Sequence, residues 1–291
     1  MNNFEASYNK ILQVLNTIEP KSNFLNQIRQ PKMSDKELIA VSLTAEYSSI
    51  DSECQLFRML PSSLSSLIER SVYNRRKRKL GLTMERLRAH LAQQIVPVEN
   101  YHLIDSMPLE VCKLSRSKQS KICKQSYETA PSIGYCAAQK TYYYGYKLHA
   151  VTTLNGVFKS FDMTQAAVHD IHYLQDVKEQ LNDTVLIGDK GYLSSRVQLD
   201  LFTMANIHLE TPMRANQKNF QLQNPVFKKV RKRIETAFSQ RCDQFMIRRN
   251  YAKSFDGFKT RILSKIAAFT VIQFINKLDG RNINNIKIAI A

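Results

Sequence analysis

The stretch TVLIGDKGY, at residues 184–192, decides the fold class that we expect. Four apolar or strand-compatible residues run into a glycine, then an aspartate, then a second glycine. A short apolar run bounded by glycine predicts a buried strand that ends in a turn. Open α/β sheets bind ligands at the carboxyl ends of such strands, where Asp189 falls. An isolated aspartate there more often caps the next helix, so its role depends on the rest of the chain.

Strands and helices alternate on both sides of this stretch. HLID, at residues 102–105, is another short apolar run that ends in an aspartate, Asp105. Asn155-Gly156 is a strong hairpin signal between two segments rich in strand formers. In chain order we expect a strand at residues 102–105, a hairpin at 144–163, a helix at 166–182, a strand at 184–187, a helix at 194–206, a strand at 207–212 and a helix at 227–244. This order predicts an α/β fold, a mixed sheet flanked by helices.

The predicted helix at residues 227–244 carries a third acid, Glu235. Its spacing predicts a buried stripe of Val230, Ile234, Ala237 and Phe238. Glu235 is one position from that stripe and can point along the sheet edge towards the strand ends. A glutamate among so many lysines and arginines would ordinarily be an ion-pair partner only.

Taken together, Asp105, Asp189 and Glu235 suggest a shared metal site instead of three separate structural roles. Carboxylates on three elements of one mixed sheet can converge on a pair of divalent ions. Mg²⁺ or Mn²⁺ prefers carboxylate and water oxygens, and phosphate oxygens complete the shell. Two such ions serve in-line phosphoryl displacement, whereas grouped carboxylates without cations would repel one another.

The charge of the chain points to a polyanionic partner. Lys and Arg number 42 against 25 Asp and Glu in 291 residues, a formal charge of +17. We expect nucleic acid rather than a membrane as the partner, because no amphipathic helix collects this charge.

Cysteine usage and apolar stretches indicate the compartment. The five cysteines are odd in number and form no CxxC pair, as expected of reduced thiols in a cytoplasmic protein. The first residues lack a signal-peptide pattern, and the longest apolar stretch, residues 266–275, is too short to span a bilayer.

Residues 1–100 are predicted to be helical, with a capping box at Ser34 and Glu37. Their most charged feature is a run of five cations within YNRRKRK, at residues 73–79. Such a run needs a phosphate partner or remains a solvated face, and the segment by itself fits both. The candidate DNA-binding residues of this run are Arg75, Arg76, Lys77, Arg78 and Lys79.

A second basic segment, residues 113–147, interleaves seven cations with six tyrosines and contains one acid, Glu128. Basic residues with aromatics suit phosphate contacts and stacking on bases. The tyrosines also suit a strand, and we expect both. Further along, His169 and Asp170 precede a predicted helix; they could reach a catalytic centre, but we favour capping.

The order and spacing of the three acids resemble those of DDE transposases of bacterial insertion sequences. LIDS at residues 103–106 resembles the first-aspartate motif, LIGDKGY at 186–192 the second, and RKRIETAF at 231–238 the glutamate helix. The likeness runs from about residue 61 to 278 and is greatest to the insertion-sequence 982 family. That family resemblance rests on the basic run, on YYGYKLH at 143–149 and on the Ile-Glu-x-x-Phe pattern.

The resemblance implies a ribonuclease-H-like catalytic fold and a transposase that binds terminal inverted repeats. It would cleave a phosphodiester at the element end and use the freed 3′-hydroxyl to attack target DNA. It implies two ions, Mg²⁺ or Mn²⁺, held by Asp105, Asp189 and Glu235. Arg231 would contact DNA or steady Glu235, Lys190 and Tyr192 would touch the flanking backbone, and His149 and His169 are further candidates near the site.

The resemblance also implies an organisation and a setting. We expect a helical DNA-binding region at residues 1–100, a catalytic domain at 101–278 and a short tail at 279–291. The protein would act as a homo-oligomer in a synaptic complex, in the cytoplasm at the nucleoid. Many relatives have a basic residue seven positions after the glutamate; here Cys242 stands there, and Arg241 is the candidate substitute.

Two other functions fit the sequence. One is a ribonuclease-H-like nuclease that cleaves without strand transfer. The other is a non-catalytic DNA-binding protein derived from a transposase, against which three intact carboxylates argue.

Overall fold

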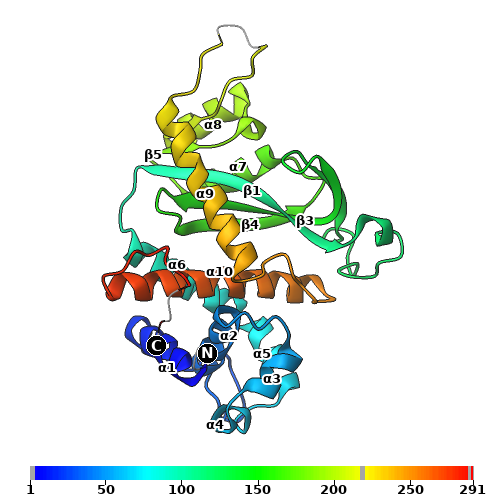
Figure 1. Cartoon of the computed structure of the whole chain (residues 1–291), viewed down its shortest axis with the longest axis vertical. Coiled ribbons are helices and arrows are strands. Elements are labelled where there is room, and N and C mark those ends of the chain that lie inside the picture. Colours follow the sequence, from blue (N-terminus) through cyan, green and yellow to red (C-terminus); the bar gives the residue numbers. More distant parts are fainter. Residues whose placement is uncertain (1–3, 217–219, 288–289, 291) are drawn as a thin grey trace. The chain divides into compact units, whose positions relative to one another are not determined.

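The computed structural model describes residues 4–216, 220–287 and 290, and the side chain of Arg241 is not among the described parts (Figure 1). Part of the basic, glutamine-rich loop after residue 213 therefore lies outside the described residues. The chain divides into two compact units, Met1–Ile95 with Gln240–Ala291, and Val96–Ser239. By their contacts, residues 240–278 group with the N-terminal helices. The functional domain boundaries expected near residues 100 and 278 stay a prediction.

The first unit is helical. Its helices are α1 Phe4–Ile18, α2 Asp35–Tyr47, α3 Glu53–Met59, α4 Ser62–Ser65, α5 Arg70–Lys79, α6 Gly81–Ile95 and α10 Phe255–Leu278. Helices α2 and α10 are buried on nearly all sides, as expected for the central helices of a helical core. The predicted capping box begins α2: the Ser34 hydroxyl accepts from the Glu37 amide, and the Glu37 carboxylate accepts from the Ser34 amide.

The second unit is built on a mixed sheet. Its strands are β1 Tyr101–Cys112, β2 Ser132–Cys136, β3 Thr141–Thr153, β4 Phe158–Gln165, β5 Thr184–Ile187 and β6 Ile207–Glu210. The strand order is β2-β3-β1-β5-β6, and β4 also pairs with β3. Strands β1 to β4 pair antiparallel, whereas β1, β5 and β6 are parallel to one another.

Helices cover both faces of this sheet (Figure 1). Besides the short turns η1 Leu114–Arg116, η2 Asp170–Tyr173 and η3 Lys190–Tyr192, they are α7 Leu174–Gln180, α8 Ser195–Ala205 and α9 Pro225–Asp243. On one face α7 and α8 close a core that contains Ile104, Val151 and Leu186. On the other face Phe238 of α9 meets Phe158 edge-on, with 6.3 Å between ring centroids.

The Asn155-Gly156 turn joins β3 and β4, as the sequence predicted. Gly156 has φ +79, a conformation that glycine adopts without strain. A β-carbon there would lie 3.7 Å from the Ala237 Cβ. The hairpin turn therefore packs directly under α9 and fixes the helix that carries Glu235.

Two predicted elements differ in extent. Residues 166–182 are not one helix but a turn, η2 and the short α7. Strand β1 continues past Asp105 to Cys112, because β3 pairs with it along that whole length. Within the described residues no helix combines the length and apolar character needed to span a bilayer.

Candidate active site

Asp105 and Asp189 lie side by side where β5 ends. The parallel register pairs Leu103 with Ile187, so both strands reach an aspartate two residues further on. Neighbouring strands lie about 4.8 Å apart. Asp105 therefore lies within β1, next to the point where the neighbouring strand β5 has ended and no longer pairs with β1.

The backbone turns sharply after β5 to carry Asp189. The Gly188 amide donates to the Glu210 carbonyl at 2.9 Å, and the Asp189 carboxylate then caps η3 by accepting from the Gly191 amide at 2.7 Å. The capping role considered for an isolated aspartate is therefore real. The hydrogen bond from the Gly191 amide to Oδ1 holds the Asp189 carboxylate in a defined orientation.

Close neighbours within this chain explain why positions 188 and 191 of this turn are glycines. A β-carbon at Gly188 would lie 3.0 Å from Ile104 Cγ2 and 3.1 Å from the Tyr192 ring, and one at Gly191 would lie 2.9 Å from Asp189 Oδ1. The contacts show that these glycines admit neighbouring side chains of this chain.

Helix α9 brings Glu235 and Arg231 to the same region. Ile234, Ala237 and Phe238 are buried as predicted, whereas Glu235 is exposed and Arg231 is half-buried. The α9 side chains act on Asp105, whose pKa is raised to about 7. The causes are burial first, opposed by the Ser106 amide; Asp189 then raises it, Arg231 lowers it and Glu235 raises it.

Asp189 and Glu235 thus both lie within electrostatic range of Asp105, in the same unit. Their oxygens are the donors that Mg²⁺ and Mn²⁺ prefer. A divalent ion would favour the ionised form of Asp105, which burial first and then Asp189 and Glu235 disfavour. In the described part of the chain, however, no three His, Cys, Asp or Glu side chains stand close enough to hold one ion. The carboxylate oxygens are suitable ligands for divalent cations, but within the described residues they do not form a complete coordination site.

Tyr192 occupies the core instead of the surface. Its side chain is fully buried in the cluster under α7 and α8, and within the described structure its hydroxyl has no hydrogen-bond partner. Burial raises the pKa of this hydroxyl well above its usual value, and Asp170, Asp105 and Asp189 raise it further. The expected DNA contact by Tyr192 is therefore corrected, because the ring cannot reach a backbone; Lys190 beside it is exposed.

His169 and His149 have structural partners. His169 is exposed and caps η2, accepting from the Ile171 amide at 3.3 Å, which is the capping role we favoured. His149 is buried, stacks on Tyr173 with 5.1 Å between centroids, and contacts the Thr164 hydroxyl at 2.8 Å. Burial lowers the pKa of His149 to about 4, opposed by Asp170, so its imidazole is neutral at pH 7.

Asp170 is a site neighbour that the sequence interpretation assigned to capping. Its carboxylate accepts from the Ser106 hydroxyl at 3.0 Å and pairs with the Lys147 ammonium at 2.9 Å. The sequence signal was the His-Asp pair after an apolar run, but nothing local distinguishes it from a cap. Its partners lie far away in the sequence.

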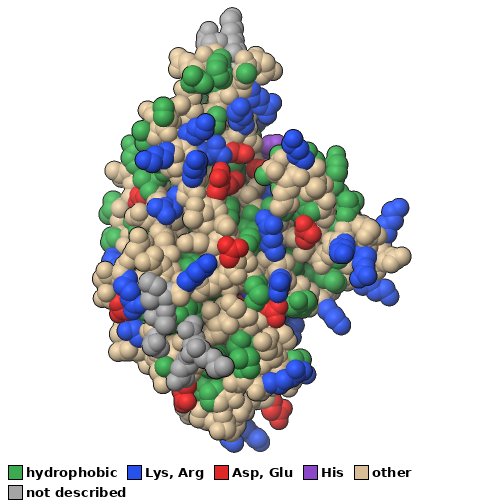
Figure 2. Space-filling view, viewed as in Figure 1, with side chains coloured by type: hydrophobic (Ala, Val, Ile, Leu, Met, Phe, Trp, Pro, Cys, Tyr) green, Lys and Arg blue, Asp and Glu red, His purple; other side chains and the backbone are tan. Residues whose placement is uncertain are grey.

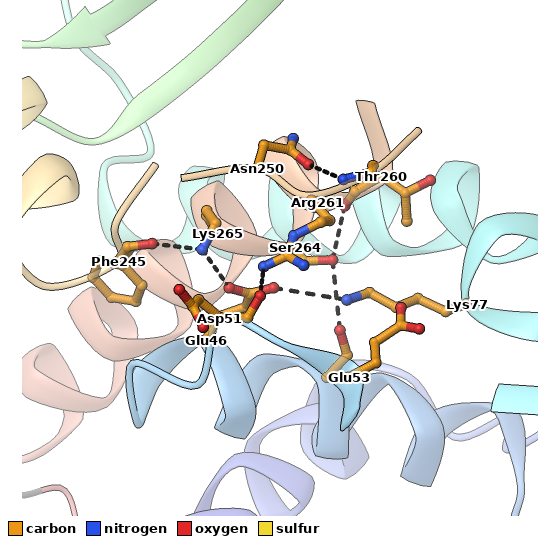
Figure 3. Close-up of polar contacts among 12 residues, drawn as sticks. Glu46, Asp51, Glu53, Lys77, Phe245, Asn250, Thr260, Arg261, Ser264 and Lys265 are labelled. Atoms are coloured by element: carbon orange, nitrogen blue, oxygen red, sulfur yellow. Dashed lines mark hydrogen bonds and ion pairs between the residues drawn. The ribbon is translucent and has the colours of Figure 1, made fainter. Parts of the chain in front are cut away.

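The cations of the basic run in α5 fall into two groups. Arg76 and Lys77 are buried and paired with Asp35, at 2.7 Å, and Glu46, at 3.7 Å. Figure 3 shows Glu46 between Lys77 and Lys265, whose ammonium lies 2.7 Å from the same carboxylate. The prediction of five DNA-binding cations is therefore corrected for Arg76 and Lys77, whose charges are neutralised inside the helical unit. The exposed members are Arg75, Arg78 and Lys79.

The mixed sheet flanked by helices is consistent with a ribonuclease-H-like transposase domain. A family model described as "Transposase DDE domain" matches residues 101–271. The chain therefore belongs to the DDE-domain transposase family. A comparison with curated proteins finds no match. Cys242, seven positions after Glu235, is half-buried.

Proposed function

We propose that this protein is the transposase of a bacterial insertion sequence, of the insertion-sequence 982 family. It would cleave DNA at the terminal inverted repeats of its element and join the freed 3′-hydroxyl to target DNA. The observation that carries the proposal is the β1–β5 register, which aligns Asp105 with Asp189 beside the helix of Glu235. The family match supports the class, and the motifs support the subfamily.

In this proposal Asp105, Asp189 and Glu235 hold two divalent ions, Mg²⁺ or Mn²⁺. When bound, the ions supply activation of the attacking oxygen and stabilisation of the leaving oxygen in an in-line displacement. Asp189 is oriented for this task by the Gly191 amide, and Glu235 by the buried stripe of α9. Arg231 and Lys190 would contact phosphates of the DNA beside the carboxylates.

The DNA surface that we propose has one part in each unit. In the helical unit it consists of the exposed cations of α5: Arg75, Arg78 and Lys79. In the sheet unit it is the segment 113–142, where lysines and arginines gather on the projecting part at the right of Figure 2. Tyr135 and Tyr142 face each other there across β2 and β3, both at least half exposed, with ring centroids 5.0 Å apart. Such a surface suits phosphates and stacking on bases.

DNA as the partner places the protein at the nucleoid in the cytoplasm. Synapsis of two element ends would require a homo-oligomer.

The test is Asp189→Ala in the full chain, assayed on DNA that carries an element end. We expect metal-dependent cleavage to be lost while end binding remains. Asp200→Asn is the matched control, since Asp200 lies in the same unit and pairs with Lys178 at 2.9 Å. Normal cleavage by Asp189→Ala would refute the assignment of Asp189 to the catalytic site. Cleavage without joining by the unmodified protein would indicate a nuclease, and binding without cleavage a non-catalytic DNA-binding protein.

A further inference from the structure

An arm of residues 113–131 leaves the sheet between β1 and β2 and forms the projecting part at the right of Figure 1. Every residue of the arm is described by the structure, and apart from the turn η1 the arm contains no helix or strand. Loops of more than about 15 residues with so little secondary structure are usually either functional or disordered. Glu128 is the only acid of the arm, and its five cations are all exposed: Lys113, Arg116, Lys118, Lys121 and Lys124.

The arm rests against a row of tyrosines on β3. Tyr142, Tyr144 and Tyr146 project from the same face of the sheet, because side chains two residues apart on a strand share a face. The Tyr146 hydroxyl donates to the Thr129 carbonyl at 2.6 Å, and the Lys124 ammonium lies 5.6 Å from the centre of the Tyr144 ring. Tyr142, at the free end of the row, is 63% exposed. The arm therefore covers two of the three rings and leaves the third open.

Gln165, the register partner of Tyr146 on β4, holds the part of the arm that returns to the sheet. Its amide nitrogen donates to three arm carbonyls: Tyr127 at 3.3 Å, Glu128 at 3.2 Å and Ala130 at 2.8 Å. Since the amide has two hydrogens, these carbonyls share its donors. Together with the Tyr146 hydroxyl, Gln165 thus binds the carbonyls of four consecutive residues, 127–130. These contacts fix the path of a segment that has no ladder hydrogen bonds of its own.

The strand register gives the position of the arm relative to Asp105. Asp105 pairs with Ala150, and Tyr146 lies four residues before Ala150 on β3, so Asp105 and Tyr146 project from the same face of the sheet. At about 3.3 Å per residue, Tyr146 is about 13 Å and Tyr142 about 26 Å from Ala150 along β3. Duplex DNA rises about 3.4 Å per base pair, so these lengths correspond to about four and eight base pairs.

An arm that is already ordered is suited to bind a polyanion. A mobile loop must be ordered when it binds, and that ordering costs free energy, whereas a preformed surface avoids the cost. The exposed ammonium and guanidinium groups of the arm suit contacts with phosphates, which position a nucleic acid without reading its sequence.

We propose that Tyr146 and Gln165 are positioning residues that hold the arm as a preassembled phosphate-binding surface, which contacts duplex DNA about four to eight base pairs from the phosphodiester that is cleaved. The inference rests on the proposed function. It predicts that the arm contributes to binding only when the DNA extends far enough from the cleavage site to reach it.

The first experiment measures binding of the full chain, without divalent ions, to element-end duplexes shortened stepwise on one side of the cleavage site and then on the other. On one side, the unmodified protein should lose about tenfold in affinity when the duplex is cut from about twelve to about four base pairs. Lys118→Gln combined with Lys121→Gln should bind the long duplex about tenfold more weakly and lose less than about twofold on the same shortening, because the arm contacts are already weakened. Arg196→Gln removes an exposed cation of α8 in the same unit and should respond to shortening like the unmodified protein. The inference is overturned if shortening affects the unmodified protein and the arm variant equally on both sides.

The second experiment tests the two positioning residues. Tyr146→Phe combined with Gln165→Met keeps every arm cation but removes the donors to the arm carbonyls. Trypsin should then cut within the arm about tenfold faster in the absence of DNA, and the long duplex should bind about fivefold more weakly. Tyr143→Phe is the matched control and should change neither measurement, since the Tyr143 hydroxyl has no hydrogen-bond partner within the described residues.

A general structural role for the two residues gives a different result, in which cutting is faster throughout the chain and not chiefly in the arm. That result overturns the positioning role, as does unchanged digestion or unchanged DNA binding. Circular dichroism checks folding; if the double variant does not fold, Tyr146→Phe alone decides by the same two measurements.

Failure of the proposed function would look different from failure of the inference. If the unmodified protein binds no element-end DNA of any length, the proposed function itself fails. If it binds this DNA and the arm variants bind it equally well, only the role of the arm is removed.

Discussion

The guanidinium of Arg76 lies 2.7 Å from the carboxylate of Asp35, and both side chains are buried. The other oxygen of Asp35 accepts the Phe24 and Leu25 amides, each at 2.8 Å. The carboxylate therefore ties α5, the start of α2 and the loop before α2 together. A residue from the most basic run of the chain has a structural task within the helical unit.

Arg76→Ala should destabilise the protein by about 3–5 kcal/mol, because it leaves the Asp35 charge buried without its cation. Urea unfolding followed by circular dichroism measures the change. Arg75→Ala, one residue away and exposed, is the matched control and should change stability by no more than about 0.5 kcal/mol. Equal destabilisation by the two variants would refute the division of the run.

The exposed members of the run should behave in the opposite way. Replacing Arg75, Arg78 and Lys79 with glutamine should leave stability nearly unchanged but weaken DNA binding. The slope of log K against log salt should fall by about 0.9 for each phosphate contact removed. Titrations at several salt concentrations measure the slope. An unchanged slope would exclude this surface of α5 from the DNA interface.

Much of the sheet could be predicted because its signals are local. Asn155-Gly156 specifies a hairpin by its own backbone preferences, and the glycine-bounded run at 184–192 specifies a buried strand and turn. The order Asp105, Asp189, Glu235 on their elements followed from the same local patterns. These predictions needed no knowledge of distant contacts.

What the sequence could not provide depends on pairing between distant residues. Strand β2 forms because β3 offers it a partner, and β1 extends past Asp105 for the same reason. Asp170 resembles a helix cap locally, whereas its partner Ser106 is 64 residues away. Arg76 and Lys77 look like surface cations until α2 supplies Asp35 and Glu46.

His102 should make stability depend on pH. Its Nδ1 lies 2.8 Å from the Thr184 hydroxyl, and its pKa is lowered to about 4 by burial first and then by Lys159. The unfolded chain, with a pKa near 6.5, binds the proton first as the pH falls. The contribution of neutral His102 is therefore present above pH 6.5 and is lost as the pH falls towards about 4.

The measurement for His102 is the free energy of unfolding at several pH values. The difference between unmodified protein and His102→Gln should shrink by up to about 3 kcal/mol between pH 7 and pH 4, since each pKa unit corresponds to about 1.4 kcal/mol. Other groups that titrate in this window, such as Asp105, are present in both proteins, so their contributions cancel in this difference. A difference independent of pH would refute the assignment.

Gly191→Ala should impair cleavage without unfolding the protein. The added β-carbon would stand 2.9 Å from Asp189 Oδ1 and 3.4 Å from Asp170 Oδ2, so the Asp189 carboxylate must move. Displacement of a reacting group by about 1 Å can reduce a rate about a hundredfold. Initial cleavage rates measure the effect, and Gly81→Ala is the control, because its β-carbon would meet nothing closer than 3.9 Å. Equal rates for the two variants would show that the Asp189 orientation tolerates displacement.

Tyr135 and Tyr142 should contribute to DNA binding through their exposed rings. They are register partners on β2 and β3, and the exposed cations around them belong to the same segment. Replacing either ring with alanine should weaken binding of single-stranded DNA by about 1–3 kcal/mol if a base stacks on it. Fluorescence anisotropy with single- and double-stranded oligonucleotides measures this, and retained double-strand binding would assign the rings to unpaired bases. Tyr143→Phe is the control: that ring is buried, so binding should not change. If both alanine variants bind all DNA forms as tightly as the unmodified protein, this pair of tyrosines has no part in the DNA surface.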